Sequence, residues 1–167
     1  NSASCTAASW AWGEKGGAGQ RPWRLKSSVV ASQVAIHREW GGVVPELSAR
    51  QHIRDICGVV ERTLLDGGQA RYDGVAVTTG PGLVGSLLVG VAFAKSLAWA
   101  SRVPLIPVHH LAGHVESLVL EGGEMPLPAV VLIVSGGHTS LYVVRAPGSL
   151  ELIGRTRDDA AGEAYDK

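Results

Sequence analysis

Two histidines spaced like metal ligands are the sharpest chemical feature of the sequence. His110 and His114 are four residues apart in a segment that reads as a helix, so both imidazoles project from one face. That spacing suits a single metal ion. A chance pair among the six histidines of the chain, or a helix cap, is the competing interpretation.

The surroundings of this pair do not complete a site. A catalytic metal normally has three protein ligands and an open position, and Glu116 points elsewhere on a helix than His114 does. Leu111 stands where zinc proteases of the H-E-x-x-H type carry their general-base glutamate. The usual metalloprotease mechanism therefore lacks its base.

A glycine-containing loop between two expected strands is a candidate anion site. Gly136 and Gly137 leave backbone N–H groups open to an anion, and Ser135 and Thr139 add hydroxyl donors. Such a loop could cradle a phosphate or a carboxylate without a lysine. An ordinary glycine hairpin is the alternative, and spacing alone favours neither.

Acidic residues gather near the end of the chain. Asp158 and Asp159 are placed to cap a helix, and Asp159, Glu163 and Asp166 lie on one face of it. A solvated acidic face is the favoured interpretation. Beside a phosphate loop, the same carboxylates could instead hold Mg²⁺ or a hydroxyl of a ligand.

Gly80, Gly82 and Gly85 form a dinucleotide-binding fingerprint between an expected strand and an expected helix. The fingerprint also needs an acidic residue about 20 positions later. The sequence has Arg102 there, and Pro81 sits inside the turn. We interpret the motif as a tight turn that permits close packing of the helix on the strand.

The elements that must position these residues alternate between strands and helices. Strands are expected at 28–36, 74–79, 104–108, 128–135, 140–144 and 151–156. Helices are expected at 45–65, 83–100, 110–120 and from 158 onward, with a loop at 37–42. This order predicts an α/β fold. The helix at 83–100 is apolar on most sides, so we expect it to be buried.

Composition places the chain among globular proteins. Its 167 residues are 46% hydrophobic and 18% charged, which excludes a disordered chain. The formal net charge of zero gives no support for a general polyanion-binding surface, although a local basic patch stays open. Two cysteines, Cys5 and Cys57, are too few for a disulfide scaffold and indicate a reducing compartment. The most apolar stretch, 83–101, carries Lys95, so no membrane span is expected.

The first 26 residues differ from the rest of the sequence. They hold three of the five tryptophans and show neither helical nor strand periodicity, so we expect a disordered tail or a misread upstream frame. The start at Asn1 and the end inside an expected helix indicate a fragment.

Five motifs, taken in order, resemble those of one family. They lie at 41–46, 79–83, 109–114, 134–139 and 158–163. The same motifs occur in the same order in the TsaD family of tRNA N6-adenosine threonylcarbamoyltransferases, once described as O-sialoglycoprotein endopeptidases or glycoproteases. The resemblance covers residues 28–167 and is nearer to the bacterial and organellar branch than to the archaeal one.

The resemblance implies an α/β fold of the actin-like (ASKHA) ATPase type, in partial form. Residues 27–127 would be most of the first lobe and 128–167 the beginning of the second lobe, with 1–26 outside the family. The implied reaction transfers a threonylcarbamoyl group from threonylcarbamoyl-adenylate to N6 of adenosine 37 in tRNAs that read ANN codons, which forms t6A.

The resemblance also implies ligands. His110 and His114 match the family's metal-binding pair, with iron or zinc as the divalent metal, and this metal would polarise the acyl donor as a Lewis acid. An ATP- or ADP-type nucleotide is a further expected ligand. No residue is identified as the base that deprotonates the adenosine amine. The matches to the family's substrate or nucleotide contacts are Ile133, Val134, Ser135, Gly136, Gly137 and Asp166.

The departures from the family concern both ends of the chain. The family opens with a strand carrying Gly-Ile-Glu-Thr-Ser-Cys-Asp and a second strand, neither of which residues 1–26 contain. It continues past Lys167 with an aspartate as third metal ligand. We therefore expect the chain alone to be inactive and marginally folded.

The expected partners are tRNA and, in bacteria, TsaB-like and TsaE-like proteins, with no membrane. The expected compartment is the cytoplasm, and mitochondria or plastids are the alternative.

Three other functions compete with the transferase. A metal-dependent O-sialoglycoprotein endopeptidase is disfavoured because no glutamate follows His110. A non-catalytic TsaB-like partner subunit would lack the metal histidines, which this sequence retains. An actin-fold sugar or acetate kinase would need phosphate-binding residues on a first strand that the sequence does not show.

Overall fold

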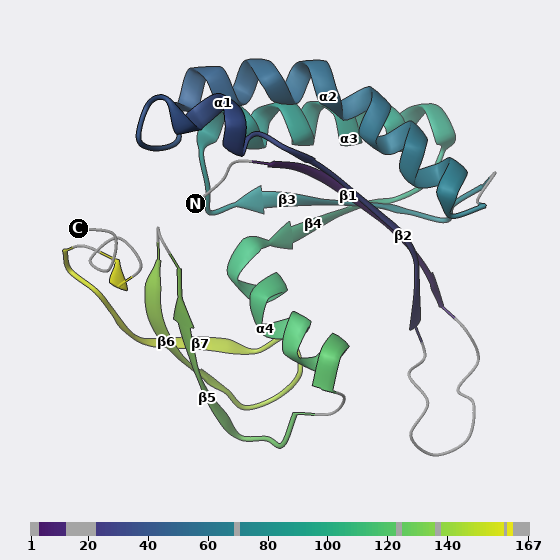
Figure 1. The fold of residues 1–167 in the computed structure, drawn as a ribbon. Helices are drawn as coiled ribbons and strands as arrows, with labels where there is room; N and C mark the ends of the chain where they lie inside the picture. The colour runs from purple at the N-terminus through teal and green to yellow at the C-terminus, as the bar shows by residue number, and fades with distance from the viewer. Residues whose placement is uncertain are drawn as a thin grey trace. The chain divides into compact units, whose positions relative to one another are not determined.

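The chain forms two compact units, and the border between them falls between Val108 and His109. We describe them from a computed structural model, which covers residues 4–12, 23–68, 71–122, 125–135, 138–158, 160 and 161. Figure 1 labels the helices and strands of both units along the chain. The lobe boundary expected after residue 127 stays a prediction.

The first unit consists of two strand pairs covered by helices. Its elements are β1 (Ser4–Trp12), β2 (Trp23–Ser32), α1 (Val34–Arg38), α2 (Pro45–Asp66), β3 (Val75–Gly80), α3 (Val84–Ser101) and β4 (Leu105–His109). β1 and β2 pair antiparallel, and β3 pairs with β4. Helix α2 packs against β1, β2 and α3, and α3 also packs against β3. The two long helices lie on the same side of the strands (Figure 1).

The expectation that the first 26 residues lack regular structure is wrong for Ser4–Trp12 and for Trp23 onward. The buried positions of β1 include the polar Ser9 beside Cys5, so hydrophobic alternation does not reveal the strand. Ser9 Oγ lies 2.8 Å from Ser27 Oγ, which donates to the carbonyl of Thr63 at 2.6 Å. A register shift after Ser9 breaks the strand period as well.

The strand expected at 28–36 ends at Ser32. Helix α1 begins at Val34 and takes the place of the end of that strand and of the start of the loop expected at 37–42. The cause is Gln33, whose side chain is fully buried. Its carbonyl accepts the backbone N–H groups of Ile36 and His37 at 3.1 and 3.2 Å. These bonds turn the chain into a helix, although Val34 and Ile36 alternate as in a strand.

Helix α2 is confirmed within one residue of its expected bounds. Pro45 occupies the first turn, where its missing N–H costs no hydrogen bond, and Glu46 lies at the positive end of the helix dipole. The backbone N–H of Gly67 caps the helix on the carbonyl of Thr63.

Helix α3 has the expected position but is not buried on all sides. Ala94 and Ala98 face the interior, whereas Val84 is 80% and Trp99 is 85% exposed. By length and composition alone, its 18 residues of mean hydropathy 1.4 could cross a membrane. One such helix is weak support for a span, because core helices of soluble proteins meet the same criteria.

The turn before α3 brings two helices together. A Cβ added at Gly85 would lie 3.2 Å from Cβ of Ala49 on α2. Next to this contact, Ser48 Oγ and Ser86 Oγ are hydrogen-bonded at 3.0 Å. The close approach that the glycine motif permits is therefore made to α2.

The second unit is a helix packed on a three-stranded antiparallel meander. Its elements are α4 (His110–Gly122), β5 (Ala129–Val134), β6 (Thr139–Val144) and β7 (Leu150–Arg155), in the sheet order β5-β6-β7. All four confirm sequence expectations. The core consists of Leu111, Val115, Val131, Ile133, Tyr142 and Val144. The helix expected from 158 onward lies mostly outside the described residues.

Candidate functional site

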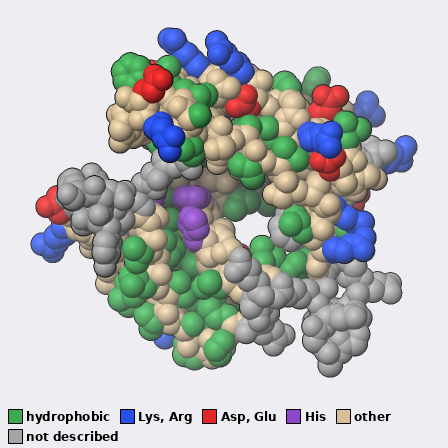
Figure 2. All heavy atoms as spheres, viewed as in Figure 1, with side chains coloured by type: hydrophobic (Ala, Val, Ile, Leu, Met, Phe, Trp, Pro, Cys, Tyr) green, Lys and Arg blue, Asp and Glu red, His purple; other side chains and the backbone are tan. Residues whose placement is uncertain are grey.

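The two candidate metal ligands lie side by side at the start of α4. His110 Nε2 and His114 Nε2 are 3.3 Å apart, and the ring centroids are separated by 4.6 Å. Two imidazoles that bind one zinc ion at about 2.05 Å and a tetrahedral angle would place their nitrogens about 3.3 Å apart. The pair therefore fits one metal ion. Figure 2 shows histidine side chains at the molecular surface.

A third imidazole approaches this pair. The ring centroid of His138 lies 6.3 Å from that of His110. The backbone of His138 is held by Ser135, whose N–H donates to the His138 carbonyl at 2.8 Å and whose Oγ accepts the His138 N–H at 3.0 Å. His138 lies within the motif at 134–139, but neither its type nor its spacing predicted a role for it. Its proximity arises because Leu111 and Val115 pack α4 onto the sheet, and local sequence carries no signal of that packing.

The electrostatic environment favours the neutral form of His110. Burial of the ring lowers the pKa of His110 below its ordinary value of 6.5, and the nearby imidazoles of His114, His138 and His109 lower it further. A neutral imidazole has a lone pair free for a metal. His110 therefore needs no deprotonation to bind a metal at neutral pH.

The candidate substrate loop is described only in part. Ile133 is buried in the core of the second unit, so only its backbone is available to a ligand. Val134 is exposed, and the Ser135 hydroxyl donates to the His138 carbonyl at 3.3 Å. The Thr139 hydroxyl accepts the backbone N–H of Ala161 at 2.8 Å. Both hydroxyls thus already form hydrogen bonds within the protein.

Several predicted site residues belong to segments outside the described part of the chain. The loop glycines, Gly136 and Gly137, lie outside the described residues, and so do Asp159, Glu163 and Asp166. Within the described part of the chain, no group of three or more His, Cys, Asp or Glu side chains is arranged to hold a metal ion. The candidate metal ligands that the structure describes are thus the two histidines, His110 and His114.

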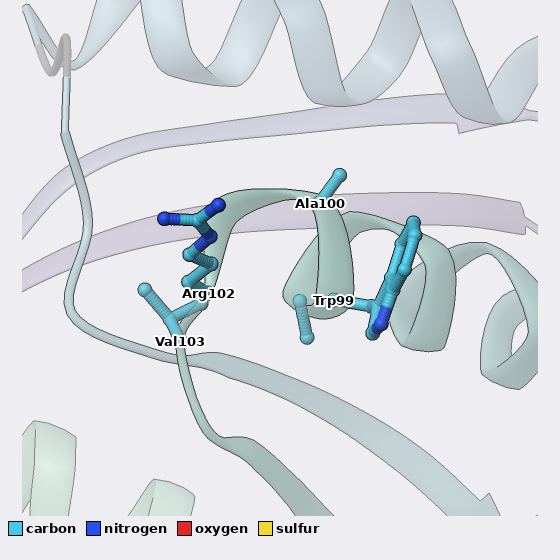
Figure 3. Close-up of a pocket in the computed structure, with 5 residues that line it drawn as sticks. Trp99, Ala100, Arg102 and Val103 are labelled. Carbon is cyan, nitrogen blue, oxygen red and sulfur yellow. The ribbon is translucent and has the colours of Figure 1, made fainter.

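The first unit carries two hollows that the sequence did not indicate. One, of about 470 Å³, lies at the end of α3 between Trp99 and Arg102, which Figure 3 labels. The other, of about 410 Å³, is an apolar groove formed by α2 and α3. We call it the α2–α3 groove, and its lining residues are Ile53, Ile56, Cys57, Leu88, Val89, Ala92 and Phe93.

Comparison with solved structures identifies the fold. YeaZ from Pseudomonas aeruginosa is similar with a TM-score of 0.51 and 18% identity, over 91% of this chain and 62% of that chain. A second structure, of a protein described as similar to peptidase YEAZ from Pseudomonas aeruginosa, gives 0.51 and 19%, over 91% and 59%. These neighbours have the actin-like fold of the ASKHA type, so the expected fold class is confirmed.

Comparison with curated sequences gives much higher identity. The proteins of Moorella thermoacetica and Syntrophomonas wolfei are 54% and 53% identical over 146 residues, and that of Syntrophus aciditrophicus is 50% identical over 145. All three are named tRNA N6-adenosine threonylcarbamoyltransferase. Each match covers 86% of this chain but only 43% of the relative. The family model of TsaD, tRNA N6-adenosine threonylcarbamoyltransferase, matches residues 24–167, and the chain belongs to this family.

Proposed function

We propose that the protein is a transferase that forms t6A, and that this chain contributes two of its metal ligands and part of its donor-binding loop. The observation that carries the proposal is the His110–His114 pair, whose 3.3 Å separation fits one metal ion, in a chain 54% identical to a named transferase. The substrates would be threonylcarbamoyl-adenylate and a tRNA that reads ANN codons.

The described residues support distinct roles in this reaction. His110 and His114 would bind a divalent metal through Nε2, and imidazole ligands suit both iron and zinc. The metal would supply Lewis-acid polarisation of the acyl donor. The backbone of residues 133–135 borders the loop where the adenylate or an ATP-type nucleotide would lie, and Ser135 fixes His138 at the end of that loop.

The α2–α3 groove supports a protein partner. It is apolar along both helices, and Ile53 and Leu88 on its rim are 63% and 66% exposed. We propose that a TsaB-like protein docks there, because apolar helix faces of this kind bind partner helices. A TsaE-like partner and a cytoplasmic location are further parts of the proposal.

A chimera tests the proposed activity. Residues 24–167 would replace the matching segment of the Moorella thermoacetica relative, and t6A in an ANN-reading tRNA would be measured by nucleoside mass spectrometry with threonylcarbamoyl-adenylate as donor. The chimera should form t6A, and His110→Ala and His114→Ala should each abolish it. His109→Ala removes an exposed neighbouring imidazole and serves as the control. Undiminished t6A in both metal-ligand variants would refute the assignment.

The competing functions lack this support. Identity to the named transferases is 50–54%, which disfavours a non-catalytic TsaB-like subunit. The endopeptidase would require a general base beside His110, and Leu111 is buried in the core instead.

A further inference from the structure

An exposed tryptophan stands at the turn between α1 and α2. Trp40 is 65% exposed, and Arg38 and Glu39 beside it are exposed as well. The next two residues, Gly41 and Gly42, have no atom within 4 Å of the position that a Cβ would occupy. Both the indole and the adjoining backbone are therefore open to a ligand.

The turn is held in place by backbone hydrogen bonds. The N–H of Trp40 donates to the His37 carbonyl at 3.0 Å, and the N–H of Gly41 donates to the Arg38 carbonyl at 3.3 Å. Gly41 has a φ of +65°, a conformation that glycine adopts without strain. The exposed ring thus projects from a defined turn.

A buried polar chain anchors this turn to α2. The His37 ring is buried, and its Nδ1 accepts the backbone N–H of Val44 at 3.3 Å. His37 Nε2 lies 3.3 Å from Gln33 Oε1, and Gln33 Nε2 lies 2.9 Å from His52 Nδ1 on α2. These bonds fix the backbone that carries Trp40, and a preformed backbone loses less conformational entropy when a ligand binds.

The chemistry of the turn fits RNA better than protein. Unpaired RNA bases stack on exposed aromatic rings, and neighbouring arginines contact phosphates. A protein partner would favour a continuous apolar patch, as in the α2–α3 groove, whereas Trp40 follows two charged residues and precedes two glycines. We propose that Trp40 is a stacking platform for an unpaired base of the tRNA, with Arg38 at an adjoining phosphate. This inference rests on the proposed function.

Binding of an ANN-reading tRNA transcript to the whole chain tests the proposal. Trp40→Ala should weaken binding about tenfold at fixed salt, and Trp40→Phe should restore most of it, because one stacked base contributes on that scale. Trp99→Ala removes a more exposed tryptophan from the same unit and should change binding less than twofold. Arg38→Gln should reduce the slope of log K against log salt by about one. Unchanged thermal melting of each variant would show that the fold is retained.

The outcomes separate this inference from the proposed function. Equal tRNA binding by the wild-type chain and Trp40→Ala would overturn the inference and leave the proposed function intact. If the wild-type chain does not bind tRNA, both this inference and the tRNA substrate of the proposed function would be overturned. A Trp40→Ala variant that keeps tRNA binding but loses a TsaB-like protein would assign the turn to a protein partner and overturn the inference.

Discussion

The packing of α4 on its sheet predicts a stability effect that can be measured separately from the first unit. Val115 is 2% exposed and belongs to the core between α4 and β5–β6. Val115→Ala deletes two carbon atoms, worth about 0.8 kcal/mol each by transfer, and leaves a cavity, so we expect a loss of about 2 to 3 kcal/mol. For a unit of this size, that loss lowers the urea midpoint by about 2 M.

The distribution of aromatic residues supplies the assay. All five tryptophans precede residue 109, so tryptophan emission reports unfolding of the first unit, whereas Tyr142 lies in the core of the second. We expect Val115→Ala, made together with Tyr72→Phe so that tyrosine emission comes from the second unit, to shift the transition followed by tyrosine emission. Glu116→Ala, at the exposed neighbouring position, should leave it within about 0.5 kcal/mol of wild type. Equal midpoints for the two variants would refute the assigned core.

Three further predictions follow from single residues. The pKa of His110 should lie below 6.5 in an NMR titration and should rise in the His114→Ala variant. Because the folded chain binds this proton more weakly than the unfolded chain, the free energy of unfolding should fall as pH drops through 6.5. A measured pKa at or above 6.5 would contradict this prediction. Gly58→Ala, in open space within α2, should stabilise the first unit by about 0.5 to 1 kcal/mol in urea unfolding, and destabilisation would contradict the described surroundings. A thiol reagent should label the exposed Cys57 rapidly and the buried Cys5 only after unfolding. Burial and the nearby Asp55 raise the pKa of the Cys5 thiol, so little of the reactive thiolate forms. Equal labelling rates would contradict the burial of Cys5.

Local signals predicted the elements whose inward faces are apolar. Pro45 and Gly67 mark the ends of α2, and alternating apolar residues mark β5 and β6. β1 carries no such signal, because its contact with α2 includes the hydroxyl of Ser9. The burial of Gln33, which starts α1, depends on tertiary partners that no sequence window contains.

The same distinction applies to the candidate site. Helical periodicity alone predicted that His110 and His114 share a face, and the structure confirms it. His138 comes close to them only through the packing of α4 on the sheet. The overall apolarity of α3 predicted burial. In the described part of the chain, α3 packs against α2 and β3 and keeps an exposed face that includes Val84 and Trp99, and composition gave no sign of that exposed face.

Metal binding by the whole chain tests the central claim most directly. In a calorimetric titration with Zn²⁺, the wild-type chain and His109→Ala should bind one equivalent with the same affinity. The His110→Ala, His114→Ala double variant should bind at least tenfold more weakly, since it lacks both Nε2 ligands. Equal affinity in the double variant would contradict the assignment of this pair as the metal site.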